Sequence, residues 1–155
     1  MRRIGEGLWR STAPEVFATF CFGIVDPEAQ TFTFVNAGHP FPMLAGADGS
    51  VTEIEGASLP VGMDPSLMPG LVYEEKCAEF APGDVLAIYS DGVTEAGVGG
   101  EDMFGEERLS GVMAEHRPGG AGAVQGAICE AVDAFVDGEA MDDDLTLVVI
   151  GATGE

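Results

Sequence analysis

Residues 17–37, FATFCFGIVDPEAQTFTFVNA, contain two segments rich in Phe, Val, Ile and Thr, separated by a short polar stretch. Phe17–Asp26 and Thr31–Ala37 have the β-branched and aromatic composition of strands. The intervening residues 26–30, Asp-Pro-Glu-Ala-Gln, have the composition of a turn. We therefore expect an antiparallel β-hairpin at 17–37.

The segments on either side of this hairpin are expected to form further helices and strands. Ile4 and Leu8 lie at helical spacing within residues 2–11, which predicts the end of a helix there. Further strands are expected at 41–44, 51–54, 58–62, 71–80 and 84–89, with the last two pairing across the turn Ala81-Pro82-Gly83. A glycine-rich loop at 92–105, helices at 105–115 and 119–136, and a buried central strand at 145–150 complete the chain. This order of elements predicts an α+β fold.

Composition restricts the class of protein. The 155 residues include 6 Lys and Arg against 27 Asp and Glu, a net charge of −21, and 46% are hydrophobic, enough for the core of one domain. A chain with this much negative charge repels nucleic-acid phosphates and anionic lipids. We therefore expect no nucleic-acid partner and no membrane insertion. Without a signal-peptide core or a long apolar run, a cytoplasmic protein is predicted. The three cysteines are too widely spaced to suggest disulfides or a zinc site.

Acidic residues flank two of the expected strands. Asp91 follows the strand at 84–89, and the run Asp142-Asp143-Asp144 precedes the strand at 145–150. If these strands are antiparallel neighbours, both groups of acids emerge at the same end of the sheet. Carboxylates gathered there repel one another, and hard cations such as Mg²⁺ or Mn²⁺ relieve that repulsion. Taken alone, the acidic run is most simply a solvated loop, so its placement carries the interpretation.

Other polar motifs have simpler structural explanations. The Asp91-Gly92 segment does not continue as an EF-hand, because Val93 and Ala96 occupy positions that require an oxygen ligand and a glycine. His39 is expected to be a hydrogen-bonded structural residue in a turn. Asp48-Gly49 is expected to form a hairpin turn.

Seven short segments follow one another along nearly the whole chain. They are Phe17-Ala18-Thr19, Asn36-Ala37-Gly38-His39-Pro40, Leu59-Pro60-Val61-Gly62-Met63, Pro82-Gly83-Asp84, Tyr89-Ser90-Asp91-Gly92-Val93-Thr94-Glu95-Ala96, Phe104-Gly105-Glu106-Glu107-Arg108-Leu109 and Asp143-Asp144-Leu145-Thr146. In this order they resemble the SpoIIE-like branch of the PPM family, the metal-dependent protein serine/threonine phosphatases of bacteria.

The resemblance implies an αββα sandwich of two mostly antiparallel sheets with flanking helices. It also implies that Asp91 and Asp143 bind Mn²⁺ or Mg²⁺, and that a metal-activated water attacks phosphoserine or phosphothreonine. Asp143 matches the first acid of the family's Asp-Asp-x-Thr element, with Asp144 as the second choice. The implied substrates are phosphorylated regulatory proteins such as anti-sigma-factor antagonists. No side chain is assigned as a catalytic residue.

One family motif is missing from the 155 residues. Family members carry an earlier Asp-Val-Ser-Gly-His-Gly motif, whose Asp bridges the metals, followed by a long helix. Residues 1–155 are therefore expected to be a single SpoIIE-like phosphatase domain that is N-terminally truncated and lacks its first strands and bridging ligand. Exposed sheet edges would then favour a dimer. The alternatives are a non-catalytic remnant that binds the same partners, a fragment with no independent role, and an acidic metal buffer.

Overall fold

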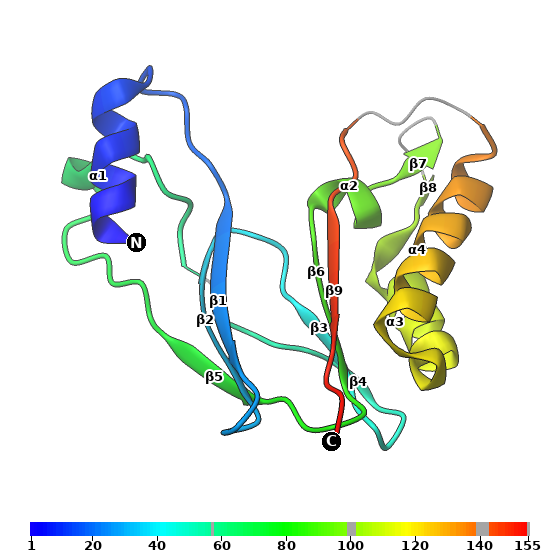
Figure 1. Cartoon of the computed structure of the whole chain (residues 1–155). Coiled ribbons are helices and arrows are strands. Elements are labelled where there is room, and N and C mark those ends of the chain that lie inside the picture. Colours follow the sequence, from blue (N-terminus) through cyan, green and yellow to red (C-terminus); the bar gives the residue numbers. More distant parts are fainter. Residues whose placement is uncertain (57, 99–101, 139–142, 155) are drawn as a thin grey trace. The chain divides into compact units, whose positions relative to one another are not determined.

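The computed structural model describes residues 1–56, 58–98, 102–138 and 143–154. The chain forms two compact units, Met1–Phe41 with Glu55–Glu79 and Pro42–Ile54 with Phe80–Glu155 (Figure 1). Each unit contains an antiparallel sheet and helices. The prediction of an α+β chain with two antiparallel sheets and flanking helices is confirmed.

The first unit is built on the expected hairpin. Its elements are α1 (Arg2–Ser11), β1 (Phe20–Asp26), β2 (Thr31–Ala37), the 3-10 turn η1 (Pro65–Leu67) and β5 (Lys76–Glu79). β1 and β2 pair antiparallel, β5 pairs with the other side of β2, and the strand order is β1-β2-β5. The first strand begins three residues later than predicted because Ala18 forms an isolated bridge with Val61. That bridge is the only strand-like pairing that the described part of the predicted strand 58–62 makes.

The core of the first unit lies against the central strand. Phe32 and Phe34 of β2 are fully buried, and their rings stack with centroids 5.0 Å apart. Gly23 of β1 leaves room for this pair, because a Cβ at Gly23 would overlap the Phe32 ring. On β1, by contrast, Phe20, Phe22 and Ile24 alternate along the strand and are 36%, 54% and 61% exposed.

The second unit contains the larger sheet. Its elements are β3 (Met43–Ala45), β4 (Val51–Glu53), β6 (Val85–Tyr89), α2 (Asp91–Thr94), β7 (Gly97–Val98), β8 (Asp102–Met103), α3 (Gly105–His116), the 3-10 turn η2 (Arg117–Gly119), α4 (Gly120–Val136) and β9 (Leu147–Gly151). The strand order of the main sheet is β4-β3-β6-β9. Helices α3 and α4 pack on one face of this sheet (Figure 1). Their apolar residues, such as Leu109, Met113, Ile128 and Val132, are fully buried there, as the helical spacing predicted.

The glycine-rich segment 92–105 is more regular than predicted. It contains the helical turn α2 and the two-stranded pair β7–β8, in which Gly97 lies opposite Met103. Residues 99–101 of the predicted loop lie outside the described residues. The expectation of a single irregular loop was wrong because Val93 and Ala96 are apolar enough to bury α2 in the core.

The predicted pairing of 71–80 with 84–89 was wrong. β5 pairs with β2 in the first unit, whereas β6 pairs with β3 and β9 in the second. The turn between them is held by Asp84, whose carboxylate accepts hydrogen bonds from the amides of Ala81 and Ala47 at 2.8 and 2.9 Å. This bond to Ala47 ties the start of β6 to the β3–β4 turn, so the turn connects two sheets and closes no hairpin.

The predicted buried central strand at 145–150 lies at the edge of its sheet. β9 pairs only with β6 among the described residues, and Val148 is 49% exposed. The apolar run is explained by its other face, because Leu147 and Val149 pack against the core under the helices.

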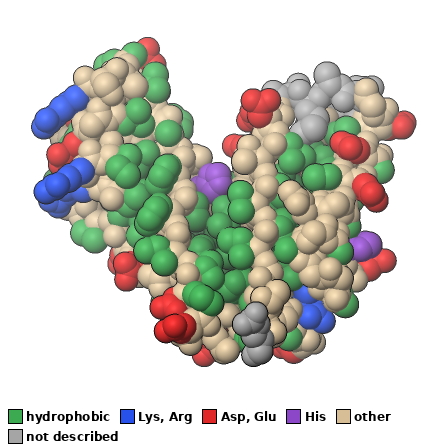
Figure 2. Space-filling model, in the orientation of Figure 1, with side chains coloured by type: hydrophobic (Ala, Val, Ile, Leu, Met, Phe, Trp, Pro, Cys, Tyr) green, Lys and Arg blue, Asp and Glu red, His purple; other side chains and the backbone are tan. Residues whose placement is uncertain are grey.

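The surface of the chain is rich in charged side chains, and the two signs are distributed differently. Acidic side chains are spread over both units, and the visible basic ones gather mostly around α1 (Figure 2). No described helix is long and apolar enough to cross a membrane. Cys21, Cys77 and Cys129 are free thiols.

Candidate metal centre

Asp91 lies where β6 ends and α2 begins. Its backbone is anchored because Val93 and Ala96, on the next turn of chain, are buried in the core of the second unit. The Asp91 side chain is exposed, and its Oδ1 accepts a hydrogen bond of 3.0 Å from the Gly92 amide. The fold therefore presents this carboxylate to solvent from a well-anchored position.

Asp143 and Asp144 lie in the segment that leads into β9, and both are exposed. The Asp144 amide donates a hydrogen bond of 2.8 Å to Asp143 Oδ1. The arrangement repeats that at Asp91, since each carboxylate is oriented by the amide of the residue that follows it. Among the described residues, no hydrogen bond reaches the Asp144 carboxylate. Asp142, the first acid of the run, lies outside the described residues.

Strand pairing brings these two segments together. β6 and β9 are antiparallel neighbours, and the ladder ends with Tyr89 opposite Leu147, two residues before Asp91 and three residues after Asp144. Beyond the ladder, the Ser90 amide donates to the Thr146 carbonyl at 2.9 Å. The Ser90 hydroxyl donates to the Asp144 carbonyl at 3.1 Å and accepts from the Thr146 amide at 3.0 Å. The prediction that both groups of acids emerge at one end of the sheet is confirmed.

The carboxylate groups at this end of the sheet are chemically suited to bind a hard divalent cation. Carboxylate oxygens are the ligands that Mg²⁺ and Mn²⁺ prefer, and Mg²⁺ keeps several waters when few protein ligands are present. No group of three or more His, Cys, Asp or Glu side chains able to hold a metal occurs among the described residues.

Residues 1–153 match the model of the family described as Stage II sporulation protein E (SpoIIE). The chain belongs to the SpoIIE family. This membership covers the whole set of ordered motifs, from Phe17-Ala18-Thr19 to Asp143-Asp144-Leu145-Thr146, and confirms the resemblance on which the metal ligands were predicted.

Three proteins illustrate what the chain is similar to. Protein IcfG from Synechocystis sp. is 26% identical over 135 residues, covering 87% of this chain and 20% of IcfG. The Mn-presoaked phosphatase domain of the cell fate determinant SpoIIE from Bacillus subtilis superposes with a TM-score of 0.73 and 19% identity, covering 99% of this chain and 64% of that one. The RsbU and RsbW domains of Rv1364c from Mycobacterium tuberculosis give a TM-score of 0.73 and 22% identity, covering 97% and 41%. The chain thus spans less than two thirds of each relative, and the two solved structures establish the fold.

Several motif residues of this SpoIIE family member act in the fold itself. The buried Asn36 side chain accepts from the His39 amide at 2.8 Å and donates to the His39 carbonyl at 2.8 Å. Gly38 adopts φ 72°, and a Cβ there would lie 2.6 Å from the Pro60 ring. In the first unit, the motif at 36–40 therefore fixes the turn after β2, and its Gly38 packs against Pro60 of the motif at 59–63.

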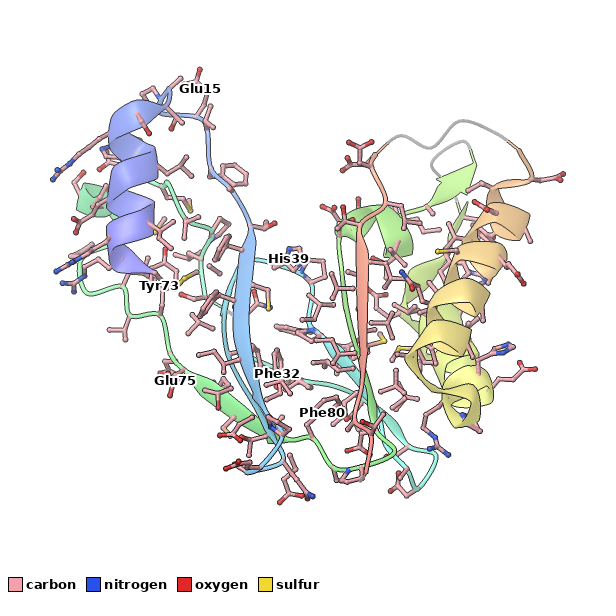
Figure 3. The ribbon with its side chains drawn as sticks, viewed as in Figure 1. Glu15, Phe32, His39, Tyr73, Glu75 and Phe80 are labelled. Atoms are coloured by element: carbon pink, nitrogen blue, oxygen red, sulfur yellow. The ribbon has the colours of Figure 1, made fainter. Side chains whose placement is uncertain are left out.

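The remaining polar positions behave as expected. His39 lies in the turn after β2 (Figure 3), with its Nδ1 3.1 Å from the Thr19 hydroxyl, as a hydrogen-bonded residue. Asp48 and Gly49 form the β3–β4 turn, where Asp48 Oδ1 accepts from the Ser50 hydroxyl at 2.7 Å. That bond, together with one from the Ser50 amide, lowers the pKa of Asp48.

Two residues beside Asp91 have structural roles that the sequence analysis did not identify. Ser90 and Gly92 were read only as parts of the Asp91 motif, although Ser90 bridges the two strands and Gly92 lies against Asp144. A serine and a glycine on either side of an acid at a strand end are the available signal. It becomes meaningful only once the partner strand is known.

Proposed function

We propose that the chain is a metal-dependent protein phosphatase domain of the PPM type, spanning both units, that hydrolyses phosphoserine or phosphothreonine. The observation that carries the proposal is the pairing of β6 with β9, which brings the segments that carry Asp91 and Asp143 to the same end of the sheet. Membership of the SpoIIE family supports it.

Asp91 and Asp143 are the residues that would hold Mn²⁺ or Mg²⁺. A cation bound there would lower the pKa of a coordinated water and offset the negative charge of a phosphate group. Asp143 is preferred over Asp144 because the Asp144 amide orients the Asp143 carboxylate, whereas Asp144 contributes its carbonyl to Ser90. The amide of Gly92 orients Asp91 in the same way. Fixing both carboxylates before the ion arrives reduces the entropy lost on binding.

The substrate is proposed to be a phosphorylated regulatory protein, such as an anti-sigma-factor antagonist. The fold shared with the RsbU and RsbW domains of Rv1364c supports a place for this chain in regulation by protein phosphorylation. The net charge of −21 favours a partner with a neutral or basic surface around the phosphorylated residue. The cytoplasmic location stays a prediction.

A non-catalytic role as a binding module for the same partners is the second candidate. The small donor number favours it, since the described residues contain no cluster of three metal-binding side chains. A module of this kind would bind the phosphorylated partner without releasing phosphate.

Release of phosphate from a phosphoserine peptide, measured against Mn²⁺ concentration, separates the two candidates. Asp91→Asn and Asp143→Asn should each lower the rate by about 100-fold or more, since even residues that only support metal ligands are worth 10- to 100-fold. Asp133→Asn, an exposed helical acid, is the control for lost charge. Metal-dependent release that survives Asp91→Asn would contradict the proposed site. No release by the parent chain, with partner binding retained, would establish the module.

A dimer formed through β1 is proposed as the state of the isolated chain. β1 is an edge strand of its sheet, and Phe20, Phe22 and Ile24 are exposed along it. Residues 16–25 contain no charged residue and no proline that would discourage strand addition. An antiparallel pair centred on Phe22 would place Phe20 of one copy opposite Ile24 of the other, joining apolar side chains and no acids.

A further inference from the structure

Ser90 occupies the residue between the last rung of the β6–β9 ladder and Asp91. It is formally the residue that caps the N-terminus of α2, yet its side chain makes no capping hydrogen bond to that helix. Serine at such a position ordinarily accepts a bond from an amide of the first turn. Here the first-turn amide of Gly92 is satisfied by Asp91 Oδ1, and that of Val93 by the Ser90 carbonyl.

The Ser90 hydroxyl is directed instead to the neighbouring chain segment. It donates to the Asp144 carbonyl at 3.1 Å and accepts from the Thr146 amide at 3.0 Å. One hydroxyl therefore spans three consecutive residues of the segment that leads into β9. Among the described residues, the remaining hydrogen bond between the two segments beyond the ladder is from the Ser90 amide to the Thr146 carbonyl, so Ser90 makes every such bond.

The position of the acids depends on these bonds because neither Asp143 nor Asp144 is itself buried. Both are exposed, as is Thr146, whereas Asp91 is anchored through the buried Val93. Leu145 is the single residue of the segment that packs against the core. Without the hydroxyl, the two segments would be joined through the ladder, the backbone bond and the packing of Leu145, none of which contacts the acids directly.

We propose that Ser90 is a positioning residue whose hydroxyl fixes the Asp143-Asp144 segment relative to Asp91 and so sets the spacing of the two carboxylates. The inference rests on the proposed function only for the identity of the ion that this spacing serves. Asp144 and Thr146 are exposed, so water can replace the lost bonds in a variant, and folding should be little affected. The spacing of the carboxylates should suffer much more than stability, as for other groups that orient metal ligands.

Amide hydrogen exchange by NMR tests the contact without any metal. The Thr146 amide should be protected in the parent chain, and Ser90→Ala should accelerate its exchange at least tenfold while core amides of α4 remain unchanged. Ser90→Thr retains a hydroxyl on a backbone already extended, with φ −79° and ψ 162°, and should restore protection. Ser110→Ala, which removes a hydroxyl from α3, is the matched control.

Mn²⁺ binding, followed by the loss of free-ion signal in electron paramagnetic resonance, tests the consequence. Ser90→Ala should weaken binding 10- to 100-fold, with rescue by Ser90→Thr and no effect of Ser110→Ala. Unchanged Thr146 exchange in Ser90→Ala would overturn the inference, as would unchanged Mn²⁺ affinity in a variant whose exchange has accelerated. A parent chain that binds no Mn²⁺ would refute the proposed metal site, and the exchange data alone would still decide whether Ser90 fixes the segment.

Discussion

Gly92 lies so close to Asp144 that a Cβ atom on Gly92 would be 2.5 Å from the Asp144 carbonyl oxygen and 3.0 Å from its carbonyl carbon. Both atoms belong to the backbone, so no change of rotamer can relieve the contact. The glycine therefore permits the segment before β9 to approach the start of α2. This approach complements the Ser90 bonds, because one residue holds the segment and the other leaves space for it.

Gly92→Ala should displace the Asp144 segment from α2. We expect a loss of about 1–3 kcal/mol in the free energy of unfolding, as for other insertions into tight packing, together with weaker Mn²⁺ binding. Urea denaturation measures the first effect. Gly126→Ala on α4 is the control, because a Cβ there meets nothing within 4 Å and helical alanine should stabilise by about 0.5–1 kcal/mol. Equal stability of the two variants would contradict the steric argument.

Asn36→Ala should destabilise the first unit by about 1–3 kcal/mol, because it removes the two hydrogen bonds that the buried Asn36 side chain makes with the His39 backbone. Thermal unfolding followed by circular dichroism measures the change. Gln125→Ala, at an exposed position on α4, controls for loss of an amide side chain. A melting temperature equal to that of the Gln125 variant would show that the Asn36 side-chain hydrogen bonds do not contribute to stability.

Local sequence patterns predicted the helices and strands better than they predicted which strands pair with one another. The hairpin at 17–37 was found because its strands and turn adjoin in sequence, and the helical faces around Leu109 and Ile128 follow from spacing alone. The pairing of 71–80 with 84–89 was wrong because short separation suggested a hairpin, while the Asp84 carboxylate instead binds the distant Ala47 amide. A side-chain bond between residues 37 positions apart leaves no mark in local composition.

The same limit applies at the end of the β6–β9 pair, where Asp91 and Asp143 lie. The location of Asp91 and Asp143 at one end of the sheet could be predicted because each lies near the end of a strand, and antiparallel neighbours bring those ends together. The roles of Ser90 and Gly92 could not, because both depend on the register that sets Tyr89 opposite Leu147. A shift of this register would point the Ser90 hydroxyl to the other face of the sheet.

Tyr89 should make stability sensitive to alkaline pH. Its burial raises the pKa of its phenol far above the ordinary value of about 10, with Glu53 and Glu106 adding to the shift. The unfolded chain then loses the proton at a pH where the folded chain retains it. The contribution of Tyr89 is thus complete below about pH 10 and falls by about 1.4 kcal/mol per pH unit above it.

Urea denaturation at a series of alkaline pH values tests this effect. Tyr89→Phe should flatten the decline, because the ring is retained and the ionisable group is removed. Tyr73→Phe is the comparison, since burial also raises the pKa of the less buried Tyr73 and its removal should have a smaller effect. A parent chain whose stability does not change between about pH 9 and pH 11 would show that the Tyr89 phenol ionises normally.

Phe22→Lys should weaken the dimer proposed for β1. The side chain is 54% exposed on an edge strand, and a lysine there would face its own copy across an antiparallel pair centred on residue 22. Opposed like charges destabilise a cross-strand pair, and lysine on an edge strand discourages strand addition. Sedimentation equilibrium should detect at least a tenfold rise in the dissociation constant. Ala29→Lys adds the same charge in the β1–β2 turn and should leave the dimer intact. If both variants associate as the parent does, or if the parent is monomeric at all concentrations, β1 does not join two copies.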